Sequence, residues 1–168
     1  MARLFQRTRQ GITAEFEQLE AELLRGLVAE LVELLDDDPA AGDAVLVRLF
    51  PPGYRDDPAA AADLRSMIEG ELRAGKIAAA QALTESLADP DHVLLDDETA
   101  EQWLTALNDL RLALGTRLDV TEDTYDEFET MAEDDPAFQS LHVYSWLGWL
   151  QETLLQALTD GPADRLTR

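Results

Sequence analysis

Two polar residues, Asn108 and Arg111, interrupt the apolar stripe of a predicted helix and are the strongest candidates for chemistry in this sequence. The stripe otherwise consists of Leu104, Leu107, Leu114, Gly115 and Leu118. A guanidinium that is removed from water without a partner costs several kcal/mol, so we expect Arg111 to be paired. The candidate partners are Glu20 and Glu30 on the first helix and Gln151 on the last helix.

Two interpretations of Arg111 follow. In the first, which we favour, Asn108, Arg111 and a partner form a buried polar bridge that fixes the register of neighbouring helices, because buried charges are normally paired. In the second, Arg111 lines a pocket for an anion or another small ligand, as in a ligand sensor or an enzyme.

Other catalytic chemistry has little support in the residue types. The chain has no cysteine, which excludes a thiol nucleophile and a thiolate metal site. Its two histidines, His92 and His142, lie far apart in sequence, and its only lysine is Lys76. The sequence contains no nucleophile elbow, P-loop or dinucleotide-binding glycine motif. We therefore predict a non-enzymatic protein with no catalytic residues, no metal and no cofactor.

Clusters of carboxylates recur in a fixed phrase. Asp-Asp-Pro-Ala occurs at 37–40, 56–59 and 134–137, and the related Ala-Asp-Pro-Asp occurs at 88–91. Asp is a favoured N-cap and proline is favoured at the first helical position, so the phrase predicts helix starts. The alternative is a divalent cation site, which needs several oxygens that converge at defined spacing. We favour helix capping.

Charge narrows the choice of partner. The 168 residues include 35 acidic and 13 basic side chains, which gives a net charge of −22 and a pI near 4.1. Such a surface repels both the phosphates of DNA and anionic lipids. Arg3, Arg7 and Arg9 form the only basic patch. No stretch approaches the roughly 20 apolar residues of a membrane span, and no signal peptide is recognisable, so we expect a cytoplasmic protein.

Periodicity predicts a mainly α, single-domain bundle of five to six helices over residues 1–160, with 161–168 as a flexible tail. A β-hairpin is expected at 2–16, and HVLL at 92–95 could add a third short strand. Helices are expected at 17–35, 43–50, 58–87, 97–118 and 136–159, with a short surface helix within 119–135. The first helix and the last two of these five should form the core bundle.

Two aromatic residues are candidates for a partner interface. Trp149 falls beside the apolar stripe of the last helix, and Tyr54 lies in a proline-rich loop. Exposed aromatic side chains suit protein interfaces, so a protein partner or a homodimer is possible at either position.

Four segments of the chain together resemble a known family. They are MARLFQRTRQG, RLFPPGYRDDPAAAADLR, AEQWLTALNDLRLALGTRL and HVYSWLGWLQETLLQAL. Over nearly its whole length the chain is similar to an actinobacterial family of unknown function (DUF series), whose members include AosR-type oxidative-stress transcriptional regulators. The resemblance implies a regulator that affects transcription under oxidative stress.

The residues present modify this expectation. Redox sensing through cysteine, which the family resemblance also implies, has no counterpart in a chain without cysteine. The net charge opposes direct DNA binding, so we expect action through a protein partner with a basic surface, such as RNA polymerase or a sigma factor.

Overall fold

The computed structural model describes residues 4–36, 44–49, 58–121 and 123–160. Helices dominate this part of the chain, in the order α1 (Gln18–Asp36), α2 (Ala44–Leu49), α3 (Pro58–Ser86), α4 (Asp97–Arg117), α5 (Thr124–Thr130) and α6 (Pro136–Thr159). A short 3-10 helix at Pro90–His92 precedes the last strand. The predicted mainly α fold is thus confirmed, whereas the proposed tail at 161–168 lies outside the described residues.

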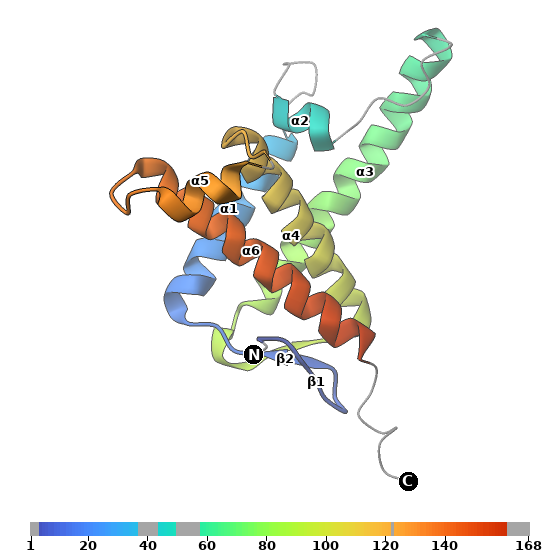
Figure 1. Ribbon diagram of the computed structural model, residues 1–168. Helices are drawn as coiled ribbons and strands as arrows, with labels where there is room; N and C mark the ends of the chain where they lie inside the picture. The colour runs from blue at the N-terminus through green and yellow to red at the C-terminus, as the bar shows by residue number, and fades with distance from the viewer. Residues whose placement is uncertain (1–3, 37–43, 50–57, 122, 161–168) are drawn as a thin grey trace.

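A small antiparallel sheet lies at one end of the helices (Figure 1). Its strands are β1 (Gln6–Arg7), β2 (Ile12–Ala14) and β3 (Val93–Leu95), in the order β1-β2-β3. Ile12 pairs with both Arg7 and Leu95. The N-terminal hairpin and the third strand near 92–95 are both confirmed. Because the third strand covers the second edge of β2, it stabilises a hairpin that would be marginal alone.

The hairpin turn depends on Gly11. Thr8 and Gly11 exchange backbone hydrogen bonds across the turn, with Thr8 N–H to Gly11 O at 2.7 Å. Gly11 has a φ of 144°, a conformation that residues with a side chain rarely adopt. A Cβ at this position would also lie 2.5 Å from the carbonyl oxygen of Leu95. The turn therefore requires glycine for both its backbone conformation and its close approach to β3.

We expect Gly11→Ala to lower the free energy of unfolding by about 1–3 kcal/mol, because the strained φ and the clash with β3 add. Urea unfolding monitored by circular dichroism measures this change. Gly26→Ala is the matched control, because nothing lies within 4 Å of a Cβ built at Gly26 in α1. That substitution should stabilise the protein by up to about 1 kcal/mol. Equal stability of wild type and Gly11→Ala would contradict the role of the turn.

Helix α4 lies at the centre of the packing. It contacts α1, α2, α3 and α6 as well as β3. The sequence predicted a core bundle of the first, fourth and last helices and left out the long helix at 58–87. This was incomplete, because α3 packs extensively on α4 and also on α1. The N-terminal end of α3 projects away from the remaining helices (Figure 1).

Three aromatic rings join the sheet end of the molecule to α4. Trp103 of α4 is fully buried, and its ring stacks on Phe16 at 5.7 Å and meets the edge of Phe5 at 5.6 Å. Phe5 and Phe16 flank the hairpin and contact each other at 6.0 Å. The hairpin is thus held to the helices by apolar packing.

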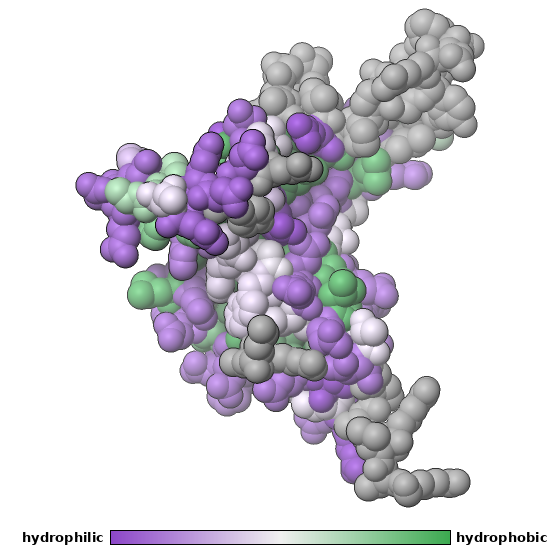
Figure 2. Space-filling model, in the orientation of Figure 1, coloured by the Kyte–Doolittle hydropathy of each residue, from purple (hydrophilic) through white to green (hydrophobic). Residues whose placement is uncertain are grey.

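Some large apolar residues of the helices are exposed. Leu19 and Leu23 of α1 and Leu72 of α3 are 76%, 39% and 43% exposed. The face drawn in Figure 2 is mostly hydrophilic, as the composition implies.

Two Asp residues in the described part of the chain cap a helix with a side-chain hydrogen bond, and one of them belongs to a predicted capping phrase. Asp135 accepts from the N–H of Ala137 at 2.9 Å at the start of α6, after which Pro136 occupies the first turn. Asp96 accepts from the N–H of Thr99 at 2.7 Å at the start of α4. Asp89 precedes the 3-10 helix without such a bond. The phrases at 37–40 and 56–57 lie outside the described residues.

Candidate functional site

Helix α4, which carries the candidate residues, is bounded by a cap at each end. At the N-terminus, the hydrogen bond from Thr99 favours the charged form of Asp96 and lowers the pKa of this carboxyl. At the C-terminus, Asp119 N–H bonds to Thr116 O and Val120 N–H bonds to Gly115 O, the pattern of a Schellman motif. These caps fix where α4 ends and hence where Asn108 and Arg111 lie.

Arg111 is held between α4 and α6. Its Nη1 donates to Oε1 of Gln151 at 2.9 Å, and its guanidinium carbon lies 5.0 Å from the ring centre of Tyr144. A Cβ on Gly148 would lie 3.3 Å from the Arg111 Nε, so the guanidinium packs directly on the α6 backbone. This Nε is buried and has no hydrogen-bond partner among the described residues.

The structure brings Arg111 together with Gln151 but not with the other proposed partners. Glu20 accepts a hydrogen bond from the N–H of Glu17 at the start of α1. Glu30 is exposed and lines a separate small cavity between α1 and α4. Asn108 is exposed, which corrects its predicted place on the apolar face of α4.

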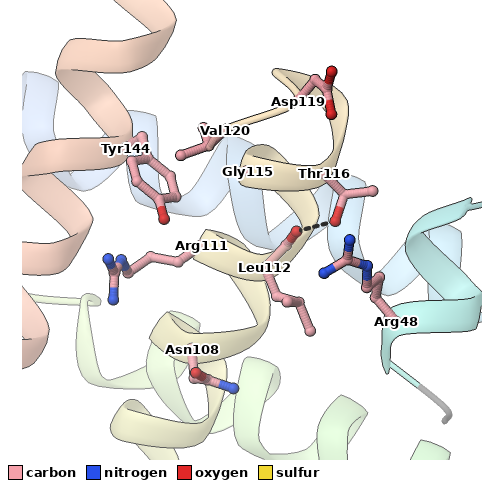
Figure 3. A pocket seen from close by; sticks show the side chains of 9 residues that line it. All are labelled: Arg48, Asn108, Arg111, Leu112, Gly115, Thr116, Asp119, Val120 and Tyr144. Carbon is pink, nitrogen blue, oxygen red and sulfur yellow. Dashed lines mark hydrogen bonds between the residues drawn. The ribbon is translucent and has the colours of Figure 1, made fainter. Parts of the chain in front are cut away.

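Asn108 and Arg111 nevertheless line one pocket of about 250 Å³ over the last turns of α4 (Figure 3). Arg48 of α2 lies at one side and Tyr144 of α6 at the other. The lining residues are Arg48, Asn108, Arg111, Leu112, Gly115, Thr116, Asp119, Val120 and Tyr144. The pocket therefore offers two guanidinium groups, the carboxylate of Asp119 and several neutral hydrogen-bonding groups in an otherwise acidic protein.

Arg48 was not singled out from the sequence. It lies in the short helix α2, which packs on α4 from the side opposite α6. Nothing in the spacing of Arg48 links it to Arg111. The one signal in the sequence that pointed to Arg48 was the scarcity of basic residues, 13 in 168. Because they are few, two basic side chains that lie close together are unusual in this protein.

Asp119 combines two features. It lines the pocket, and its φ of 54° lies in the left-handed region that the C-terminal cap of α4 requires. Aspartate tolerates this conformation less well than glycine does.

We expect Asp119→Gly to raise the free energy of unfolding by about 0.5–1 kcal/mol, because glycine removes the strain at the left-handed position. Thermal and urea unfolding measure the change. Asp119→Ala serves as the comparison and should lower stability, since alanine has neither the freedom of glycine nor a polar side chain. A lower stability of Asp119→Gly than of wild type would contradict this account of the cap.

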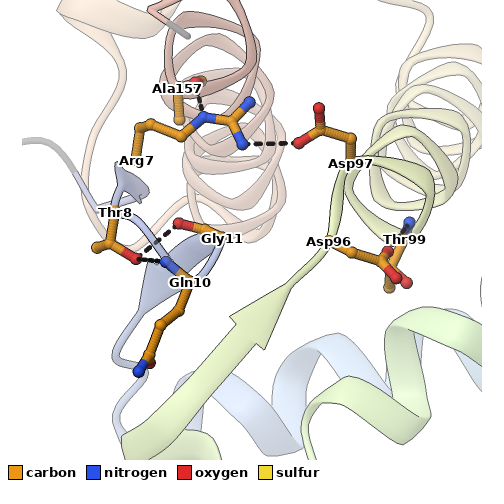
Figure 4. Close-up of polar contacts among 8 residues, drawn as sticks. All are labelled: Arg7, Thr8, Gln10, Gly11, Asp96, Asp97, Thr99 and Ala157. Carbon is orange, nitrogen blue, oxygen red and sulfur yellow. Dashed lines mark hydrogen bonds and ion pairs between the residues drawn. The ribbon is translucent and has the colours of Figure 1, made fainter. Parts of the chain in front are cut away.

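The N-terminal basic patch is reduced in the fold. The Arg7 side chain is 11% exposed, and its Nη1 pairs with Oδ1 of Asp97 at 2.7 Å (Figure 4). Its Nε donates to the carbonyl of Ala157 in α6 at 3.2 Å. Arg9 is exposed and engaged in a further interaction, and Arg3 lies outside the described residues. Arg7 therefore joins the sheet to α4 and α6.

Of the two proposed interface aromatics, one can be placed. Trp149 on α6 is 39% exposed, and Tyr54 lies outside the described residues.

A buried ion pair between α3 and α4 was missed by the sequence reasoning. Asp109 is 1% exposed, and its Oδ1 accepts from Nζ of Lys76 at 2.8 Å. Its Oδ2 is buried with no partner among the described residues. Burial raises the pKa of Asp109, and Lys76 offsets part of this effect. Lys76 was noted only as the single lysine, so its rarity was the one available signal.

The described residues contain no group of three or more His, Cys, Asp or Glu side chains that could hold a metal ion. None of their helices is both long and apolar enough to cross a membrane.

Comparison with known proteins identifies the family. Residues 1–158 match DUF2017, described as a domain of unknown function. Proteins named oxidative stress regulator AosR from Mycobacterium tuberculosis and Mycobacterium bovis are 34% identical over 173 residues, covering 83% of this chain and 78% of the relative. A putative oxidative stress regulator AosR from Mycobacterium leprae is 33% identical over the same coverage. No solved structure matches. The resemblance predicted from the four sequence segments is confirmed, and the chain belongs to the DUF2017 family.

Proposed function

We propose that this protein is a non-enzymatic regulator that acts in the cytoplasm through contact with a protein partner and not by binding DNA directly. The names of its mycobacterial relatives support a regulatory role connected with oxidative stress. Because the chain has no cysteine, the oxidative signal has to reach it by a route other than its own thiols.

The observation that carries the mechanism is the position of Arg7. DNA-binding proteins neutralise phosphates with several accessible Lys or Arg side chains. Here the net charge is −22, and the central arginine of the N-terminal basic patch is 11% exposed, paired with Asp97 and hydrogen-bonded to α6. The same acidic surface would attract a partner with a basic surface, such as a face of RNA polymerase or a sigma factor.

Two measurements test this proposal. The first titrates a fluorescent promoter duplex with the full chain at low salt, about 50 mM, where electrostatic binding is strongest. We expect no binding, and saturable binding that weakens with salt would overturn the exclusion of DNA. The second captures partners from native cells and scores RNA polymerase subunits and sigma factors. Failure to enrich any basic-surfaced protein would overturn the partner-mediated mechanism.

A second candidate function is the sensing of a small ligand in the pocket at Arg111. The observation in its favour is that Arg48 and Arg111 flank the same pocket, although the chain contains few cations. Two guanidinium groups with Asn108 and Thr116 suit a carboxylate or phosphate group, and they outnumber the one carboxylate in the lining, that of Asp119.

Arg111→Met tests the second candidate, because methionine keeps most of the side-chain length and removes the charge. Binding of inorganic phosphate and of a small dicarboxylate is measured by calorimetry on wild type and variant. Intact folding with lost binding favours the pocket. Lost folding, or no binding of either probe to the wild type, favours a purely structural bridge to Gln151.

A further inference from the structure

A groove of about 510 Å³ runs between α3 and α4, away from the Arg111 pocket. One wall is formed by residues at helical spacing on α3 and the other by residues at helical spacing on α4. The lining residues are Glu71, Leu72, Gly75, Lys76, Ala79, Glu98, Glu101, Gln102 and Thr105. The walls are more apolar than polar. Its volume falls within the range of about 300–1,000 Å³ that is usual for binding clefts.

The apolar part of the groove comes from α3. Leu72 is a large apolar side chain and is 43% exposed. One turn further along, a Cβ built at Gly75 would have nothing within 4 Å. The space over Gly75 is thus open, and Leu72 lies beside it without a described element to cover it. An apolar side chain entering here would remove this leucine from water.

The charge of the groove is negative. Glu71, Glu98 and Glu101 stand on its rim, and no ion pair or hydrogen bond to these three carboxylates is found within the described residues. The single cation in the lining, Lys76, already pairs with the buried carboxylate of Asp109 at 2.8 Å. Lys76 therefore does not offset the three rim carboxylates.

We propose that this groove between α3 and α4 is the docking site for a basic amphipathic helix of the partner protein. Apolar side chains of the helix would cover Leu72 and Gly75, and its Lys or Arg side chains would pair with Glu71, Glu98 and Glu101. Helix-in-groove recognition uses this combination of an apolar seam with flanking charges. The proposal rests on the proposed function, because it assigns a place for the protein partner.

Charge also decides between a partner and a second copy of this chain. Two copies that met through this groove would bring two sets of rim carboxylates together, within molecules that each carry a net charge of −22. Like charges placed opposite one another oppose association. A basic segment is attracted by the same groups, so the groove fits a basic partner and not a homodimer.

The test uses the full chain and a defined probe. The probe is a fluorescein-labelled helical peptide of about 14 residues, roughly four turns, with Leu on one face and Lys on the other. Its control has Glu in place of every Lys. Fluorescence anisotropy should show binding of the Lys peptide, weakening as salt rises, and no binding of the Glu peptide. No binding of the Lys peptide at low salt would overturn the proposal.

Two glycine variants separate the groove from the general acidic surface. Gly75→Arg places bulk and positive charge in the groove, whereas Gly70→Arg makes the same change on the same helix outside it. Neither position has an atom within 4 Å of a built Cβ, so both variants should fold. We expect Gly75→Arg to weaken peptide binding about 10-fold or more, equivalent to 1.4 kcal/mol, and Gly70→Arg to change it much less. Equal effects would overturn the proposal.

Two pairs of carboxylate variants, matched to each other in net charge, give an independent check. Glu98→Gln with Glu101→Gln should weaken binding several-fold and flatten its salt dependence. Glu127→Gln with Glu129→Gln on α5 removes the same charge outside the groove and should have a smaller effect. Sedimentation of the free protein as a dimer that Gly75→Arg dissociates would instead identify a second copy as the occupant and overturn the proposal.

The outcomes distinguish this inference from the proposed function. One outcome is that cells yield a partner whose capture is unaffected by Gly75→Arg. The protein then acts through protein contact at another surface, and the proposed docking site in the groove is wrong. If the peptide discriminates between Gly75→Arg and Gly70→Arg but cells yield no partner, the groove binds basic helices and the proposed function fails.

Discussion

Lys76→Met should lower the free energy of unfolding by about 3–5 kcal/mol, the usual cost of removing one partner from a buried ion pair. The substitution leaves the carboxyl of Asp109, which is 1% exposed, without the ammonium that now lies 2.8 Å away. Its second oxygen already lacks a hydrogen-bond partner among the described residues. Urea unfolding at pH 7 measures the loss.

Two comparisons isolate the cause. Lys76→Met combined with Asp109→Leu removes both charges and should recover most of the lost stability, because a well-packed apolar pair often replaces a buried ion pair without cost. Asp97→Asn breaks the pair with Arg7, in which Asp97 is 67% exposed, and should cost at most about 1 kcal/mol. If Lys76→Met costs less than about 1 kcal/mol, the pair between Lys76 and Asp109 is accessible to water.

The same carboxyl predicts a dependence on pH. Burial raises the pKa of Asp109 above the ordinary aspartate value of 3.8, so over part of the acidic range the folded protein keeps a proton that the unfolded chain has lost. The contribution of the Asp109 carboxyl to the free energy of unfolding is therefore fully present below pH 3.8. It is lost as the pH rises through the pKa of Asp109 in the folded protein. Asp109→Asn removes the titration. Its stability relative to wild type should increase with pH across this window, and parallel curves would contradict the prediction.

Trp103→Ala is the second change with a large expected effect. We expect a loss of about 3–5 kcal/mol, the range for removing a fully buried large aromatic side chain. Trp103 is 0% exposed and contacts both Phe5 and Phe16, so alanine leaves a cavity where the hairpin meets α4. Unfolding in urea measures the stability.

The remaining tryptophans provide controls for this prediction. Trp149→Ala, at a position 39% exposed, should cost about 1 kcal/mol or less. Trp103→Phe should cost less than Trp103→Ala, because it retains a ring and removes an indole N–H that has no partner among the described residues. If Trp103→Ala and Trp149→Ala cost the same, the aromatic cluster does not hold the hairpin.

Local patterns predicted the elements well for physical reasons that are themselves local. Asp135 with Pro136 marks the start of α6 because capping involves only the first turn of the helix. Gly11 marks the hairpin turn because its φ is set within four residues. The third strand was foreseen because β2 needs a neighbour and 93–95 is apolar.

The side-chain surroundings were harder to predict, as Asn108 and Asp109 show. The apolar stripe placed Asn108 toward the core, yet Asn108 is exposed and Asp109 is buried. A single stripe suits a helix with one buried face, but α4 is covered by four other helices and has a much wider buried arc. Burial of Asp109 also depends on Lys76, which lies 33 residues away on α3. A pattern within one helix cannot predict a contact between residues that far apart in the sequence.

The link from Arg7 to Ala157 joins residues 150 positions apart in the chain. The first strand therefore cannot complete its contacts until the last helix has been synthesised. During translation the N-terminal hairpin has to wait, with Phe5 and Phe16 unburied, first for α4 and then for α6. Such late closure of distant segments slows folding and lengthens the time during which apolar residues are exposed to other chains. We therefore expect the N-terminal segment to be the part of the nascent chain that is most prone to aggregation.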